Sequence, residues 1–206
     1  MTKKIWLFAS ALLSLSSSLV SAADTKNYKI DGSHSNVGFT ARHMISRVNG
    51  EFADFDGHFS FNPEDLKMSK VTASVKAASI STKDKKRDDH LRSDDFFGVK
   101  KFPTLEFVSK QVTEAGQQKY KMVGDLTMHG VTKSVTFDLE YLGESDDPWG
   151  GHRAGFTAKT KVNRKDFGMN WNKVLDKGGV LVGDEVEVMI NVEGLQTQPE
   201  THSKKI

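Results

Sequence analysis

The sequence predicts an all-β protein, an extended antiparallel barrel of about eight strands with a short helix between two of them. Apolar and polar residues alternate with period two through most of 28–192, as strands with one buried face do. Short turns separate most of the alternating runs, which suits a meander that closes on itself. The alternation breaks off over 83–97, where the helix is expected.

The expected strands follow one another along the chain. A short run at 28–31 precedes a strand that carries Val37 and Phe39 on one face. The segment 48–61 is rich in aromatic residues and contains two glycines, so it indicates a bent strand pair, because glycine inside a strand marks a bulge or a corner. Six further strands are expected over 71–77, 104–108, 119–126, 135–141, 156–162 and 186–192.

The helix is expected over 83–95. Asp88 precedes Arg92 by four residues, the favourable order for an ion pair on a helix. Leu91 is the only apolar residue in the first turns, so this helix is too polar to be stable alone. We therefore expect it to lie across the barrel, held by Leu91 and by the two phenylalanines that follow the helix.

Composition divides the chain into three parts. Residues 1–23 combine two lysines, an uncharged run and Ser-Ala-Ala at the end, which indicates a signal peptide cleaved after Ala23. The run is short and serine-rich for a membrane span, so we expect export to the periplasm and no stable membrane insertion. Residues 24–195 form the barrel domain, and 196–206 form a flexible polar tail.

The charge balance limits the possible partners. The chain has 29 basic and 27 acidic residues, and removal of the two lysines in 1–23 leaves 27 of each. A nucleic-acid or anionic-membrane partner would require a basic surplus, so neither is expected. There is no cysteine, and disulfides therefore do not hold this fold.

The sequence lacks the common catalytic motifs. It has no G-x-S-x-G, no phosphate-binding loop and no H-E-x-x-H. The seven histidines are scattered, with none paired at i+2 or i+4, so no metal site is expected. His90 with Asp88 or Asp89 is the one acid–base candidate, but neighbours on a helix do not face each other. No catalytic residue is therefore expected.

A barrel of this size is either filled by its own side chains or holds one small ligand. The alternation alone does not distinguish these two interiors, and by itself it favours the filled one.

Motifs spread over 28–194 resemble those of the YceI-like family. They are, in order, Asp31-x-x-His34-Ser35 with Phe39 and His43; Arg87-Asp88-x-His90-Leu91-Arg92-Ser93-x-Asp95-Phe96 with Phe102-Pro103; Gly124-Asp125-Leu126-Thr127-Met128-His129-Gly130; and Asp147-Pro148-Trp149-Gly150-Gly151 with Asn163-Arg164-x-Asp166-Phe167-Gly168. The resemblance implies a lipocalin-like barrel whose interior holds a polyisoprenoid, an isoprenoid quinone or a similar long amphiphile, with no other cofactor.

This implied function defines two sets of candidate residues. The barrel lining is expected to be Val37, Phe39, Val75, Phe96, Phe97, Leu105, Phe107, Tyr120, Met122, Phe137, Leu139, Phe156, Met169 and Ile190. Methionine adapts to irregular apolar shapes, which suits branched isoprene units. The candidates for binding a head group at the mouth are Arg42, His43, His90, Arg92 and His129.

The expected function is a periplasmic carrier of an isoprenoid lipid, as a monomer or a homodimer. Two alternatives stay open. One is an exported stress-response protein with a different lipid, or with a protein partner at an exposed strand edge. The other is an enzyme that acts on an isoprenoid lipid.

Overall fold

The computed structural model describes residues 25–176 and 178–197. In this part of the chain lie eleven strands, one α-helix and three short 3-10 helices. The strands are β1 (Lys26–Ile30), β2 (Asn36–His43), β3 (Ser46–Phe52), β4 (Phe55–Phe61), β5 (Lys70–Lys76), β6 (Ile80–Ser81), β7 (Thr104–Gly116), β8 (Lys119–Met128), β9 (Val131–Asp146), β10 (His152–Asn163) and β11 (Val182–Gln196). The helices are α1 (Lys85–Arg92), η1 (Leu66–Met68), η2 (Ala77–Ser79) and η3 (Arg164–Phe167).

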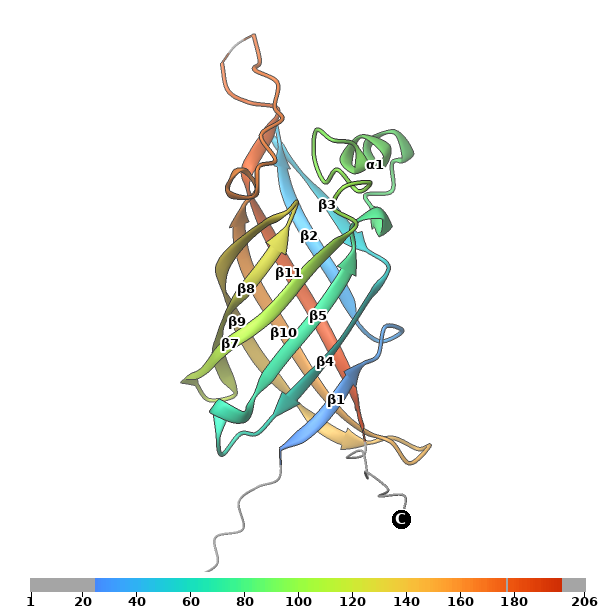
Figure 1. Cartoon of the computed structure of the whole chain (residues 1–206), viewed down its shortest axis with the longest axis vertical. Coiled ribbons are helices and arrows are strands. Elements are labelled where there is room, and N and C mark those ends of the chain that lie inside the picture. The colour runs from blue at the N-terminus through green and yellow to red at the C-terminus, as the bar shows by residue number, and fades with distance from the viewer. Residues whose placement is uncertain (1–24, 177, 198–206) are drawn as a thin grey trace, which may run out of the picture.

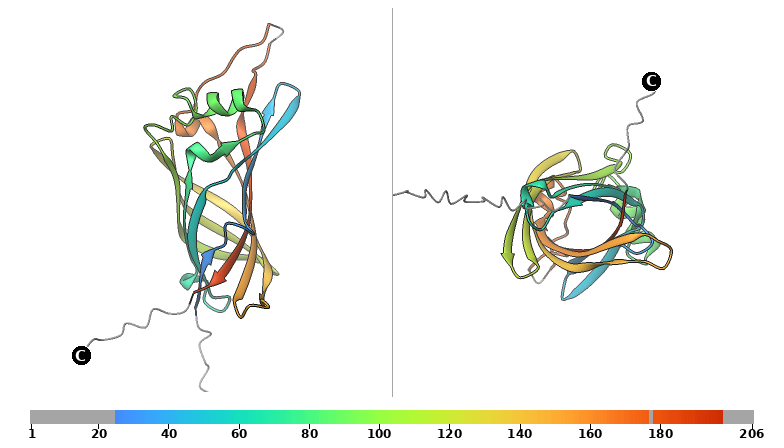
Figure 2. Two further views of the ribbon diagram at one scale, coloured as in Figure 1. Left: turned by 90° about the vertical axis from the view of Figure 1, so that its right-hand side faces the viewer. Right: turned by 90° about the horizontal axis from the view of Figure 1, so that it is seen from below.

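The strands form one antiparallel sheet that closes through β1, which pairs with both β4 and β11. The closed ring contains eight strands, β1, β4, β5 and β7 to β11, so the predicted eight-stranded antiparallel barrel is confirmed. The rest of the sheet extends from β11. Its residues 194–196 pair with β1, whereas 182–191 pair with β2, which continues to β3 and β6. Figures 1 and 2 show the resulting long barrel.

The two ends of the barrel differ. The upper end in Figure 1 carries α1, the β2–β3 turn and the β10–β11 connection, while the lower end carries the start of β1 and the end of β11. Thr197 donates its amide to the carbonyl of Asn27 at 2.8 Å, which holds both ends of the barrel domain together. No helix within 25–176 and 178–197 has the length and apolarity to cross a bilayer.

The segment 48–61 contains two strands, as predicted, but they do not pair with each other. β3 pairs with β2 and β6, and β4 pairs with β1 and β5. The chain turns at Ala53 and Asp54, where Ala53 donates to the carbonyl of Ser79 and Lys76 donates to that of Asp54. This corner passes the chain from the sheet extension into the closed ring.

The helix is shorter than predicted, and its ion pair is different. Helix α1 spans Lys85–Arg92. Asp88 does not pair with Arg92, because its carboxylate is buried and accepts from the amide and the hydroxyl of Thr82. Arg92 instead donates to the carbonyl of Ile80 at 2.6 Å and to Asp89 at 3.2 Å. Polar contacts to β6 and its flanks therefore anchor this helix.

Candidate ligand-binding cavity

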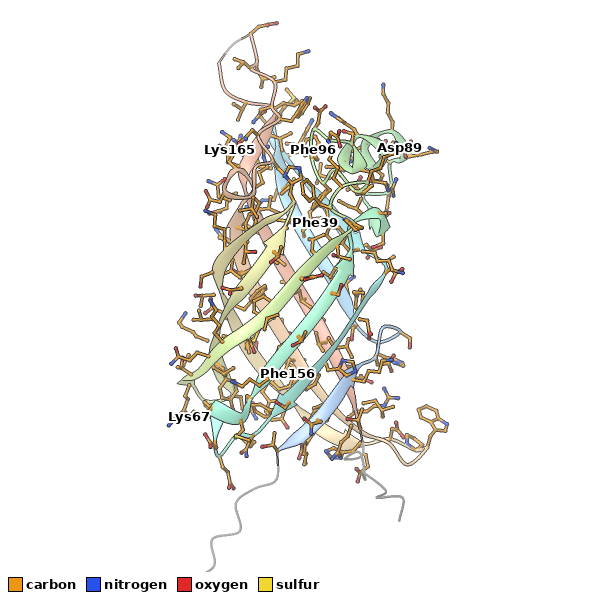
Figure 3. All side chains as sticks on the ribbon, in the orientation of Figure 1. Phe39, Lys67, Asp89, Phe96, Phe156 and Lys165 are labelled. Carbon is orange, nitrogen blue, oxygen red and sulfur yellow. The ribbon has the colours of Figure 1, made fainter. Side chains whose placement is uncertain are left out.

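A long cavity of about 280 Å³ runs inside the barrel. All fourteen residues expected to line the interior border it. Figure 3 shows Phe156 in the lower half, with Phe39 and Phe96 toward the upper end. The lining is almost entirely apolar, since inward positions of successive strands carry aliphatic and aromatic side chains. Contact of these residues with a ligand stays a prediction.

The interior is not filled by its own side chains. Phe107, Met122 and Phe137 pack into a buried cluster, but inward residues such as Leu105 and Ile190 remain partly accessible. Apolar side chains that border a cavity lack packing partners on one side. Empty space of this kind favours an apolar occupant.

Aromatic side chains close the lower end of the cavity. The ring of Phe61 packs edge-on against Tyr120 and Phe156, with centroids 5.7 and 5.1 Å apart, and contacts Tyr141 at 5.0 Å. Glu144 accepts hydrogen bonds from Lys26 and Tyr28 of β1, and Nε2 of His152 at the start of β10 lies 3.3 Å from its carboxylate. Burial, followed by the charge of Glu144, raises the pKa of Tyr141 to about 12, so this hydroxyl stays neutral at ordinary pH.

The segment around α1 covers the upper end. Phe97 packs edge-on against Phe52 with centroids 5.6 Å apart, and Phe96 lies 5.3 Å from Trp171 of the β10–β11 connection. Leu91 also borders the cavity. The expected apolar contacts of the helix segment are therefore present, at one end of the barrel.

Arg164 is the one buried basic residue that borders the cavity among the described residues. Its guanidinium donates to the carbonyls of Gly183, Met169 and Trp171, and to Asp184 at 3.2 Å. Burial lowers the pKa of Arg164. We did not predict it as a site residue. Its position in the sequence could have indicated this role, because Arg164 follows the inward-facing Val162 by two residues and so falls on the same, inward face.

The five head-group candidates lie at the upper end, outside the lining of the cavity. Arg92 binds backbone carbonyls, and Nδ1 of His129 lies 3.0 Å from the carbonyl oxygen of Phe167. His90 contacts Asp95 at 2.9 Å and packs between Phe96 and Trp171. Arg42 is exposed and His43 half-buried. Their head-group role stays a prediction.

A polar cluster outside the barrel also has the residue types of a metal site. Candidate ligand atoms of Asp31, His34 and Glu193 all lie within 4.8 Å of one another. The guanidinium of Arg153, however, lies 2.8 Å from Asp31 and 2.6 Å from Glu193. Hydrogen bonds from Ser33 and from Arg153 hold the pKa of Asp31 far below its usual range. This geometry favours an ion-pair network that ties β1, β10 and β11 together.

A closed antiparallel barrel around a long apolar cavity defines a protein class built to enclose an apolar molecule. The chain belongs to the YceI-like domain family, whose model matches residues 28–194. It is 42% identical over 193 residues to a UPF0312 protein of Photorhabdus laumondii, which covers 92% of this chain and 95% of the relative.

Two solved structures share the fold. The Campylobacter jejuni YCEI protein has a TM-score of 0.67 at 31% identity, covering 76% of this chain and 90% of that one. A polyisoprenoid binding domain from Saccharophagus degradans has a TM-score of 0.59 at 12% identity, covering 82% of this chain and 98% of that one.

Proposed function

We propose that this protein is an exported, periplasmic carrier that holds a polyisoprenoid or a similar long-chain amphiphile inside its barrel. The observation that carries this proposal is the long apolar cavity. An isoprene chain offers only apolar surface, and burial contributes about 0.8 kcal/mol for each methylene-sized group. A partly enclosed chain therefore gains several kcal/mol in such a cavity, without any charged partner along its length.

The polyisoprenoid binding domain of Saccharophagus degradans supports the ligand class, since a domain with this binding function has the same fold. The branching of a prenyl chain suits this lining, where the adaptable side chains of Met122 and Met169 lie among aromatic residues. An isoprenoid quinone satisfies the same requirements.

Binding is favoured over catalysis. The acid–base candidate His90 contacts Asp95 rather than Asp88 or Asp89, and it lies outside the cavity. Asp88 is occupied by Thr82. Among the residues that the structure describes, none of the cavity-lining residues forms a paired acid and base, so their geometry does not favour the enzyme alternative.

The expected signal peptide at 1–23 lies outside the described residues, as do 198–206 of the expected polar tail 196–206. Gln196, at the start of that expected tail, still belongs to β11. The sequence pattern of 1–23 supports the proposed export. We expect the mature protein to begin at Asp24 and to be released by osmotic shock. N-terminal sequencing of the released protein tests this, and a mature form that retains Met1 would remove the argument. The expected oligomeric state, a monomer or a homodimer, stays a prediction.

Solvent extraction of the purified protein, followed by mass spectrometry, tests the ligand. We expect a prenyl lipid from the wild-type protein and little or none from Phe107→Asp, which places a charge in the cavity. Val108→Asp is the matched control, because Val108 is the next residue and is 50% exposed. It should retain the lipid. Absence of any prenyl lipid from the wild-type protein, after expression in a host that makes one, would contradict the proposal.

Phe107→Asp can also unfold the barrel, so a milder change accompanies it. Phe107→Leu keeps an apolar wall and should fold normally, while altering the affinity for long prenyl chains. Equal affinity of Phe107→Leu and wild type for a series of prenyl chain lengths would exclude this wall from the binding site.

A further inference from the structure

The turn between β2 and β3 exposes two apolar side chains. His43 pairs with Ser46, so Met44 and Ile45 alone form the turn. Ile45 is fully exposed, and Met44 is 42% exposed. Exposed apolar side chains are common when scattered singly, but here two of them occupy the tip of a hairpin.

This turn has residues that its geometry does not favour. Two-residue hairpin turns prefer asparagine, aspartate and glycine, because these residues tolerate positive φ. Met44 nevertheless has a φ of 51°. Local rules are broken mainly at functional sites. Turn formation alone therefore does not explain the apolar pair.

The β10–β11 connection beside this turn exposes another apolar side chain, that of Val174, near its base, where Val174 bridges Val180. Met44, Ile45 and Val174 are together called the apolar tips. The amide of Met44 donates to the carbonyl of Leu181 at 2.9 Å, and His43 pairs with Val182. These contacts fix the β2–β3 turn against the β10–β11 connection, in which Val174 is 76% exposed. In Figures 1 and 2 both segments project beyond the barrel at its upper end.

Basic side chains accompany the apolar tips. Arg42 and Lys173 are exposed, and Lys173 forms no ion pair with any residue in the described part of the chain. Arg164 and Lys165 both pair with the same carboxylate, that of Asp184. Arg42 also lies close enough to Asp184 to help lower its pKa, so three basic groups share this carboxylate, and Asp176 is an exposed acid of the same connection. The basic groups named here therefore outnumber these acids.

The lower end has the opposite character. Trp149 is 85% exposed in the β9–β10 loop, but acidic residues surround it in the sequence, with Asp146 and Asp147 immediately before Pro148 and Glu144 close by. Acidic side chains disfavour an anionic surface. Exposed Met68 at this end lies between Lys67 and Lys70, but among the described residues only the upper-end tips lie next to the helix segment that borders the cavity.

We propose that the upper end docks reversibly on an anionic lipid bilayer, with Met44, Ile45 and Val174 inserted at its surface and Arg42 and Lys173 against the lipid phosphates. This inference rests on the proposed function, since a carrier must load and release its lipid at a membrane. Only three apolar side chains enter the bilayer, so docking is weak and transient.

Flotation with vesicles tests the docking. The vesicles consist of phosphatidylcholine, alone or with about one third phosphatidylglycerol. We expect the wild-type protein to float with the anionic vesicles, and Ile45→Asp to reduce the bound fraction about tenfold. Aspartate suits a turn, so Ile45→Asp should remain folded. Trp149→Asp is the matched control at the lower end and should bind as the wild type does.

Three flotation results would overturn the docking proposal: no flotation of the wild-type protein, unchanged flotation of Ile45→Asp, or loss of flotation in Trp149→Asp alone. A wild-type dimer that Ile45→Asp abolishes would also overturn it, because the apolar tips would then contact a second copy of the chain. Mass spectrometry of extracts from the same preparations separates the two proposals. Lipid retained without flotation contradicts docking only, and flotation without any bound prenyl lipid contradicts the carrier function only.

Discussion

Glycines allow aromatic rings to lie flat against the barrel wall. A Cβ atom on Gly50 would lie 2.2 Å from Cζ of Phe39, and one on Gly124 would lie 2.4 Å from Cζ of Phe107. Both rings border the cavity. Each of these glycines therefore sets the position of a cavity-lining ring on the neighbouring strand.

Gly50→Ala should move the ring of Phe39 and destabilise the protein by about 1–3 kcal/mol, the usual cost of overpacking. Urea unfolding measures the change. Gly32→Ala is the control, because no atom lies within 4 Å of its Cβ position, and a surface change of this kind costs within about 0.5 kcal/mol. Equal effects of the two substitutions would show that the ring of Phe39 moves freely.

His152 gives the lower end a pH dependence. Hydrogen bonding to Asp146 is the largest cause that raises the pKa of His152; burial opposes it, and hydrogen bonding to Glu144 adds to the rise. Because the pKa of His152 is higher in the folded state than in the unfolded chain, the protonated side chain stabilises the fold. This stabilisation is complete below the unfolded-state pKa of about 6.5 and is lost as the pH rises through the folded-state pKa.

His152→Gln should therefore destabilise the protein more at about pH 5.5 than at about pH 9. Urea unfolding of both proteins at the two pH values measures the difference. His58→Gln, on the outward face of β4, serves as the control. An equal loss at both pH values for His152→Gln would mean that the protonated form gains nothing from Asp146 and Glu144.

At the scale of elements, the alternation predicted the strands that have a regular period. It placed Val37, Phe107 and Ile190 on inward faces, because residues two apart share a face of a strand. It did not predict β6, because a strand of two residues is too short to show a period. It also did not predict that β2 and β3 leave the closed ring, because the pairing partner of a strand leaves no pattern in its own sequence. The prediction of a hollow interior came from the resemblance to the YceI-like family, because filled and hollow barrels have the same alternation of apolar and polar residues.

The α1 segment occupies a weak point of the barrel. Over 46–50, the outer edge of β3 has no partner among the described strands. The segment that carries α1 lies next to this edge (Figure 1), and Phe97 reaches Phe52 at the end of β3. Elements held by few buried apolar contacts open at low free energy. The segment is therefore the candidate gate for ligand exchange.

Phe96→Ala should speed the release of a bound prenyl lipid, while lowering global stability less than Phe137→Ala. Phe96 holds the segment against Trp171, whereas Phe137 packs with Phe107 in the central cluster. Stopped-flow release of a fluorescent prenyl analogue and urea unfolding measure the two effects. Unchanged release in Phe96→Ala, with a loss of stability as large as in Phe137→Ala, would make this segment a fixed part of the core.

For the whole molecule, the two ends have separate roles. Aromatic packing closes the lower end, and the network of Arg153 with Asp31, Asp147 and Glu193 fixes the neighbouring strands. The upper end carries the helix segment, the apolar tips and Arg164. Between them lies apolar surface that the chain does not cover itself, and in the proposed function the ligand completes the hydrophobic core.

Removal of the lipid should therefore destabilise the whole barrel. A ligand that binds only the folded state adds about 2.7 kcal/mol when its free concentration is a hundred times Kd. We expect solvent-extracted, refolded protein to unfold at a lower urea concentration than the same protein reloaded with a prenyl lipid. Phe107→Asp, if folded, should show no such shift, because its cavity carries a charge. Equal unfolding midpoints for the extracted and reloaded wild-type protein would mean that the cavity gains nothing from an occupant, and the interior would then be stable while empty.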